Sequence, residues 1–179
     1  MILKTVAITE KYSNLEEVAS LAKEAFPPEE YLPPETLIEM SKGQDMDFWA
    51  LHDGGRFVGF MAVKTRNTMA YLFFLAIMPP LRSSGYGGRA IETLKALYPS
   101  MQQVVDLEMI DDTAANNEQR KSRRSFYLRH GYQATGQFLS YYGVDYEVLC
   151  MDSRFDLNTF QELMDSLPLK DFHPIWFTR

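Results

Sequence analysis

The feature that most constrains the fold of this chain is a glycine-rich turn between an apolar run and an amphipathic helix pattern. The segment reads Leu75-Ala-Ile-Met-Pro-Pro-Leu-Arg-Ser-Ser-Gly-Tyr-Gly-Gly88. Its apolar beginning predicts a strand, and apolar residues recur at helical spacing after Gly88. Glycines let the backbone approach a ligand closely, and the free N–H groups and dipole of a helix start favour negative charge. The first hypothesis is therefore that the turn binds a phosphate-bearing ligand.

The turn differs from the two common nucleotide-binding loops. It fits the pattern Arg-x-x-Gly-x-Gly from Arg82, and it lacks the Lys-Ser/Thr pair of a nucleotide-hydrolysing P-loop. It also gives no consistent fit to the dinucleotide pattern Gly-x-Gly-x-x-Gly with its downstream acidic residue. Three glycines would also suit a plain strand-to-helix turn, but the apolar strand before Arg82 and the helix behind it favour pyrophosphate binding.

Strand and helix patterns alternate along the rest of the chain, which predicts a mixed α/β fold with helices covering a sheet. Ser13 and Glu16 have the spacing of a capping box at the start of the first helix. We expect one domain over residues 1–179, with a core at 3–151 and a C-terminal helix and apolar tail at 152–179. The expected strands are 3–8, 48–51, 56–64, 69–77, 103–110, 132–141 and 144–151, and the expected helices are 15–26, 34–42, 90–98, 116–130 and 158–167.

Composition excludes several classes of protein. The 46% hydrophobic and 23% charged residues are typical of a globular chain, and the net charge of −6 argues against non-specific nucleic-acid binding. The single cysteine, Cys150, excludes an internal disulfide, and no two of the three histidines have metal-ligand spacing. No run approaches the roughly 18 apolar residues that a membrane span needs. We therefore expect a cytoplasmic protein without a metal site.

Two segments together resemble a known family. Residues 75–94 are similar to motif A of the GNAT N-acetyltransferase superfamily, and Phe126-Tyr-Leu-Arg-His-Gly-Tyr132 is similar to its motif B. The two motifs are separated by one helix and one strand, as in that family. The order of the expected elements also resembles the family fold, a mostly antiparallel sheet of about seven strands flanked by helices. The resemblance covers roughly residues 3–151.

The resemblance implies a binding site for acetyl-coenzyme A. Backbone N–H groups of the turn would surround the pyrophosphate, and the end of the preceding strand would pair its backbone with the pantetheine arm. The implied coenzyme-binding residues are Leu75, Ala76, Ile77, Arg82, Ser83, Ser84, Gly85, Tyr86, Gly87 and Gly88.

The resemblance also implies two catalytic residues. Tyr127 matches the motif B tyrosine and would protonate the departing thiolate, although a helical tyrosine can also serve only in packing. An attacking amine must lose a proton, and Glu108 is the best-placed carboxylate, with Asp106 or water as alternatives. One departure from the family is that Arg120 stands seven residues before Tyr127, where many members have Asn.

The implied activity is N-acetyl transfer from acetyl-coenzyme A to an amine of a small molecule or a peptide. A non-catalytic coenzyme A-binding module and the use of another acyl-coenzyme A remain as alternatives. The acidic residues Asp106, Glu108, Asp111 and Asp112 suggest a cationic acceptor. The apolar tail after Pro168 is expected to pack on the domain or to form the interface of a homodimer.

Overall fold

The computed structural model describes residues 1–179 and confirms the mixed α/β fold. It contains five α-helices and eight strands, one strand more than the sequence predicted. The strand pairs with a defined register are all antiparallel. The chain divides into two compact units, Met1–Thr65 with Tyr71–Pro99 and Arg66–Ala70 with Ser100–Arg179.

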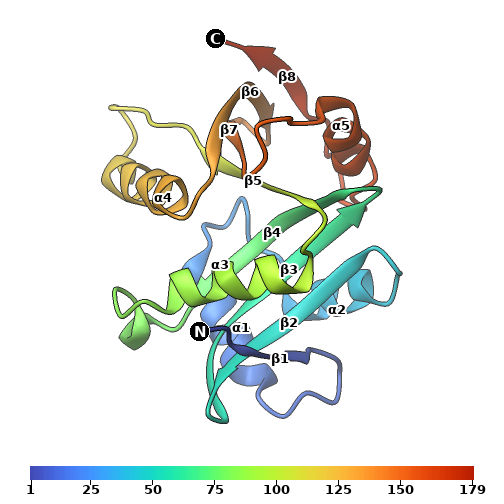
Figure 1. The fold of residues 1–179 in the computed structure, drawn as a ribbon, viewed down its shortest axis with the longest axis vertical. Helices are drawn as coiled ribbons and strands as arrows, with labels where there is room; N and C mark the ends of the chain where they lie inside the picture. The colour runs from blue at the N-terminus through green and yellow to red at the C-terminus, as the bar shows by residue number, and fades with distance from the viewer. The chain divides into compact units, whose positions relative to one another are not determined.

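The first unit is built on four neighbouring strands, with helices on both of their faces (Figure 1). In Figure 1, α3 lies on one side of these strands, and α1 and α2 lie on the other. In sheet order the strands are β1 (Lys4–Ala7), β2 (Met46–Asp53), β3 (Arg56–Arg66) and β4 (Met69–Ile77). The last residue of β3 and the first two of β4 belong to the second unit. The helices are α1 (Leu15–Ala25), α2 (Pro34–Ser41) and α3 (Tyr86–Leu97), and a 3₁₀ turn spans Pro79–Leu81.

Aromatic rings fill the space between α1 and the strands. Phe26, which follows α1, lies with its ring centroid 4.7 Å from that of Phe74 and 6.3 Å from that of Phe60. Phe48 meets Phe60 edge to face at 5.6 Å. Such pairs add to the stability that apolar burial supplies, so this part of the core fixes α1 against β2, β3 and β4.

The capping box expected at the start of α1 is not formed. Asn14 is the N-cap residue, and no side chain caps the helix. The Ser13 hydroxyl donates to Oδ1 of Asn14 at 3.0 Å instead of accepting from the helix backbone. The spacing of Ser13 and Glu16 alone therefore does not produce a capping box, because the Ser13 side chain turns toward Asn14 rather than toward the helix backbone.

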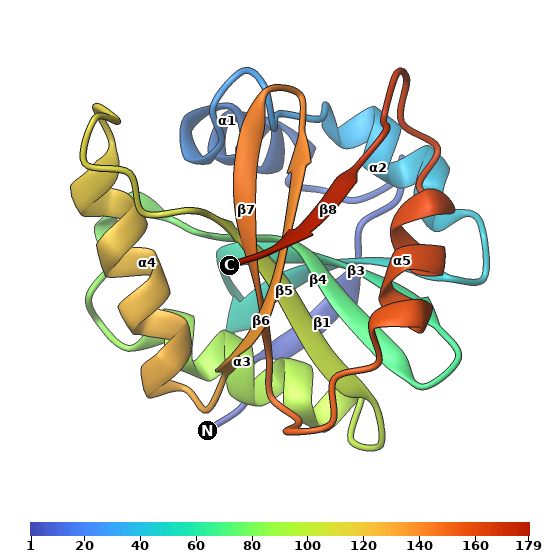
Figure 2. The same ribbon diagram turned by 90° about the horizontal axis from the view of Figure 1, so that it is seen from above.

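The second unit is built on four strands in the order β5-β7-β6-β8, flanked by two helices (Figure 2). Cys150, at the end of β7, is fully buried and belongs to the core. Gly131 follows α4 with φ 97°, the left-handed conformation in which glycine commonly ends a helix. The elements are β5 (Gln102–Glu108), α4 (Asn117–Arg129), β6 (Gln133–Tyr141), β7 (Val144–Cys150), α5 (Leu157–Asp165) and β8 (Ile175–Thr178).

The additional strand, β8, comes from the apolar tail. It pairs with β6, so that Gln137 lies opposite Thr178. The ring of Phe177 stacks on Phe138 at 5.6 Å, and Trp176 meets Phe160 of α5 at the same centroid distance. The tail thus packs on its own unit, which was one of the two expected arrangements, while the homodimer stays a prediction.

Candidate functional site

The glycine-rich turn joins β4 to α3 through strained and left-handed backbone. After the 3₁₀ turn, Arg82 is extended, Ser83 has φ 62° and Gly85 has φ 85°. Gly85 is the N-cap of α3, which begins at Tyr86. A positive φ is costly for residues other than glycine, so Ser83 carries strain of a kind that is concentrated at functional sites.

The turn presents a set of unpaired backbone donors. The N–H of Ser84 donates to Leu81 O at 3.4 Å, and that of Arg89 donates to Gly85 O at 3.1 Å. The N–H groups of residue 83 and of residues 85–88 donate to no other group of the protein. Because a helix N-terminus also carries a partial positive charge, these donors form a site for an anion.

Arg82 is held by its own unit. Its Nε donates to Ile77 O at 3.0 Å, and its two terminal nitrogens bind the carboxylate of Glu24 on α1 at 3.0 and 2.5 Å. The hydrogen bond from Arg82 lowers the pKa of Glu24. Both side chains are more than 40% exposed, so the pair adds little stability. The contacts of Arg82 with Ile77 and Glu24 instead fix the direction in which the turn continues from β4.

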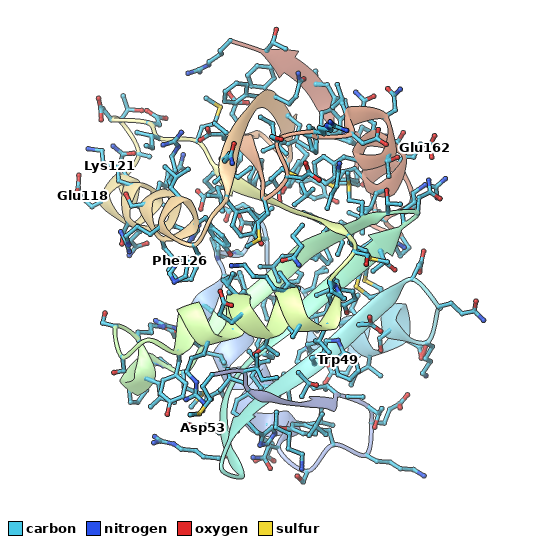
Figure 3. The ribbon with its side chains drawn as sticks, in the orientation of Figure 1. Trp49, Asp53, Glu118, Lys121, Phe126 and Glu162 are labelled. Atoms are coloured by element: carbon cyan, nitrogen blue, oxygen red, sulfur yellow. The ribbon has the colours of Figure 1, made fainter.

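Asp53 braces the other side of the turn. Its carboxylate accepts from the Tyr86 hydroxyl at 2.9 Å and from both terminal nitrogens of Arg89 at 2.7 and 2.9 Å. These hydrogen bonds lower the pKa of Asp53 to about 2. Figure 3 shows Asp53 at the end of β2, below the first turn of α3. No local sequence signal reveals this residue, because its partners lie 33 and 36 positions away.

The end of β4 is fixed by a close backbone approach. A Cβ atom on Gly59 of β3 would lie 2.1 Å from Ala76 O, a distance that no packing tolerates. The N–H of Met78 donates to Val58 O at 2.9 Å. Leu75 and Ile77 are half-buried, and Ala76 is buried. The pairing of this strand end with a pantetheine arm stays a prediction.

Tyr127 lies in the second unit, on α4, and is almost fully buried. Its ring meets Phe126 and Tyr132 edge to face, each at 5.1 Å. Its hydroxyl makes no hydrogen bond within the protein. Burial raises the pKa of Tyr127, an effect that Arg123 opposes and Asp106 reinforces. The phenol therefore keeps its proton at neutral pH, as a general acid must.

Glu108, at the end of β5, is enclosed by cations. Its side chain is 7% exposed. Its carboxylate lies 2.7 Å from a terminal nitrogen of Arg120 and 3.3 Å from one of Arg123, and Nδ2 of Asn116 donates to it at 3.3 Å. Both oxygens are thus engaged, and a proton could be accepted only by displacing one of these donors.

Arg120 connects Glu108 to the start of α4. Its Nε donates to Asn116 Oδ1 and a terminal nitrogen donates to Met109 O, both at 2.8 Å. This arginine, which stands where many family members have Asn, therefore serves in a buried ion-pair network. In Figure 3 the helix directs Glu118 and Lys121 away from the unit.

The other acidic residues expected near an acceptor have partners of their own. Asp106 accepts from the Tyr141 hydroxyl at 2.7 Å. Asp111 accepts from the N–H and the hydroxyl of Thr113, and Asp112 accepts from Asn117. The sequence cluster is therefore divided among separate contacts. The chain has no group of three or more His, Cys, Asp or Glu residues that could hold a metal ion.

Taken together, the fold and the unpaired donors of the turn between β4 and α3 define an α/β protein with a candidate anion site. The chain belongs to the acetyltransferase (GNAT) family, whose model matches residues 15–132. No curated protein sequence matches it significantly. None of its helices has the length and apolar character needed to cross a membrane.

Solved structures share this fold. A protein assigned to the GNAT acetyltransferases from Bacteroides thetaiotaomicron superposes with a TM-score of 0.70 and 24% identity, covering 89% of this chain and 92% of that one. An aminoglycoside 6'-N-acetyltransferase complexed with coenzyme A gives 0.65 and 16%, covering 86% and 100%. The ribosomal-protein-S18-alanine N-acetyltransferase from Escherichia coli gives 0.60 and 16%, covering 87% and 98%.

Proposed function

We propose that this chain transfers the acetyl group of acetyl-coenzyme A to a primary amine of a small molecule or peptide, by direct attack of the amine on the thioester. The observation that carries the proposal is the row of unpaired N–H groups at residues 83 and 85–88, in a chain of the GNAT family. These donors fit a pyrophosphate, because they supply several hydrogen bonds and a favourable helix dipole without a competing side chain.

In the proposed reaction, the amine nitrogen forms a bond to the acetyl carbon and the carbon–sulfur bond breaks. The tetrahedral species carries an oxyanion, which a backbone N–H near the end of β4 would stabilise. Tyr127 would give its proton to the departing thiolate. The unpaired, protonated hydroxyl of Tyr127 supports this role.

The amine must lose a proton before or during attack. Glu108 as the base stays a prediction, and its contacts with Arg120 and Arg123 favour the alternative in which Asp106 or water accepts the proton. In that alternative Glu108 is a positioning residue that holds the two arginines beside Tyr127.

The nature of the acceptor is left open to primary amines. The solved relatives are named for an aminoglycoside and for the alanine of a ribosomal protein, which are a small molecule and a protein. Both kinds of acceptor present an amine to a thioester, and we carry only this shared chemistry over to the present chain.

The test combines coenzyme binding with thiol release. We expect calorimetry to detect binding of coenzyme A, and a panel of aminoglycosides, polyamines and peptides to contain amines that release thiol from acetyl-coenzyme A. Mass spectrometry should then find an acetyl group on the amine. Binding without release for any amine would support a non-catalytic coenzyme A-binding module, and faster release from propionyl-coenzyme A would support another acyl donor.

A further inference from the structure

A cavity of about 460 Å³ lies in the first unit, beside the edge strand β1, and none of the residues assigned to the coenzyme lines it. Its walls come from β1, from the loop between β1 and α1, and from the turn between β2 and β3. This volume lies within the range of small-molecule sites.

The cavity carries positive charge. Lys4 and Lys11 line it, and neither forms an ion pair with the protein. No carboxylate lines it. Of the acidic residues nearest in sequence, Glu10 pairs with Lys42 at 2.7 Å and also feels the charge of Lys11, and Asp53 pairs with Arg89. Glu17 lies outside the lining but acts electrostatically on Tyr12. In a chain of net charge −6, two lining lysines, with no carboxylate in the lining, favour an anionic occupant.

Neutral polar groups of the cavity are arranged around a tyrosine–histidine pair. The Tyr12 hydroxyl lies 2.8 Å from Nε2 of His52, and Nδ1 of His52 lies 3.4 Å from Gly55 O. A carbonyl only accepts, so the contact with Gly55 O suits a hydrogen on Nδ1, and in that tautomer Nε2 accepts from the Tyr12 hydroxyl. The hydroxyl oxygen of Thr9 accepts from the N–H of Lys11 at 3.3 Å, which leaves the Thr9 O–H to donate to a ligand.

The remaining wall is apolar. Val6 and Ala7 line it, together with the ring of Tyr12, which packs on His52 and Phe57 at centroid distances of 6.1 and 6.5 Å. An inorganic ion would leave this surface without contacts, whereas an organic body would cover it. Lysine ammonium groups bind carboxylates as point charges and do not require a fixed geometry.

We propose that this cavity binds a small organic carboxylate, with its charge at Lys4 and Lys11 and its apolar part against Val6, Ala7 and Tyr12. The Thr9 hydroxyl would donate to the same carboxylate. The site is separate from acetyl transfer, and binding there can be measured without coenzyme.

The test is a titration of the isotopically labelled full chain, followed by NMR at constant ionic strength. The probes are sodium benzoate, succinate and citrate, with sodium phosphate and sodium chloride in parallel. We expect saturable shifts of the backbone amides of residues 9–13 and 52–55 with a carboxylate. The double variant Lys4→Gln/Lys11→Gln should weaken that binding at least tenfold.

The matched control is Lys23→Gln, which removes the same charge from an exposed position of α1 outside the cavity. It should leave the affinity unchanged. The proposal is overturned if no carboxylate gives saturable shifts at these amides, or if the control weakens binding as much as the double variant. Tighter binding of phosphate than of any carboxylate would also contradict it.

Discussion

Two regions of the molecule differ in whether their polar groups have partners within the protein. Both contain residues that the sequence analysis predicted to be functional. At the start of α3, five backbone N–H groups, of residue 83 and of residues 85–88, have no partner. At the end of β5, every oxygen of Glu108 is engaged by Arg120, Arg123 or Asn116. The donors of the first region are free to bind a ligand or water, whereas the polar groups of the second region are paired with one another.

This difference distinguishes a region suited to bind a ligand from a region that stabilises the fold. Unpaired donors that lie exposed at a helix start are hydrated until a ligand replaces the water, so leaving them free costs the fold little. A charged carboxylate that is more than nine-tenths buried loses its hydration, which is costly unless cations or hydrogen-bond donors replace the water. The contacts therefore favour ligand binding at the turn before α3 and a supporting role for Glu108, while Glu108 as the base stays a prediction to be tested.

The largest effect is expected for Glu108→Gln. Losing the charge leaves the partly buried Arg120 without its counter-ion, which should lower the free energy of unfolding by about 3 kcal/mol. Denaturant unfolding measures this change. The control Glu162→Gln removes a carboxylate from an exposed pair with Arg66 and should cost less than about 0.5 kcal/mol.

Glu108→Gln also tests the comparison itself. If Glu108 only supports the fold, the folded variant keeps the acidic limb of the wild-type pH–rate profile. A variant that is as stable as the wild type but has lost this limb would show that Glu108 is the base and that the comparison is wrong.

The next largest effect is expected for Tyr127→Phe. Removing the proposed acid should lower turnover about 100-fold, equivalent to about 2.7 kcal/mol, because proton transfer to the leaving group is lost. Coenzyme A affinity, measured by calorimetry, should change less than about threefold. Unchanged turnover would leave Tyr127 as a packing residue.

Tyr132→Phe is the matched control. The ring of Tyr132 contacts that of Tyr127. The Tyr132 hydroxyl is also buried, and it has no hydrogen-bond partner. Removing an unsatisfied buried hydroxyl should raise the free energy of unfolding by about 1 kcal/mol and leave turnover unchanged.

A smaller effect is expected for Gly85→Ala. A Cβ there meets nothing within 4 Å, so the cost is the positive φ alone, about 1 kcal/mol of stability. Since the turn must keep this conformation to present its N–H groups, coenzyme A affinity should also fall about tenfold. Gly143→Ala, at φ 77° and equally free of contacts, should match the loss of stability with no loss of affinity.

The smallest effect is the pH dependence contributed by Asp53. Its pKa falls from 3.8 to about 2 in the folded chain, so its stabilisation is complete above the unfolded value and is lost as pH falls toward 2. The difference in unfolding free energy between wild type and Asp53→Asn should therefore be constant at neutral pH and shrink between pH 4 and 2. A difference that does not shrink would show that the carboxylate charge does not brace the turn.

Local patterns in the sequence predicted most of the fold. The strand at residues 69–77 has the expected bounds, and the helix expected at 116–130 is one residue shorter at each end, a normal boundary uncertainty. The helix expected at 90–98 begins earlier, at Tyr86, because its first turn contains glycines and carries no apolar period. Strand β8 was missed because its three consecutive apolar residues and one threonine have no period, and only pairing with β6 makes them a strand.

The site was less predictable, for the same reason. The glycine-rich turn is local, and its conformation could be foreseen from Gly85. The contacts that hold it are not local: Glu24 and Asp53 reach Arg82 and Arg89 across 58 and 36 positions. Likewise, the sequence does not show that the carboxylate of Glu108 is paired. Its arginine partners are brought to it by the packing of α4 in the second unit, so Glu108 seemed free to act as a base.

The tail strand also bears on the solubility of the folded chain. Without residues 175–179, the nine-residue strand β6 would become the open edge of its sheet, and Phe138 and Phe160 would lose the rings that cover them. A long, uncovered edge with aromatic side chains is a template for intermolecular strand pairing. β8 replaces it with an edge of only four residues that ends beside the charge of Arg179. The tail therefore acts as a barrier against aggregation.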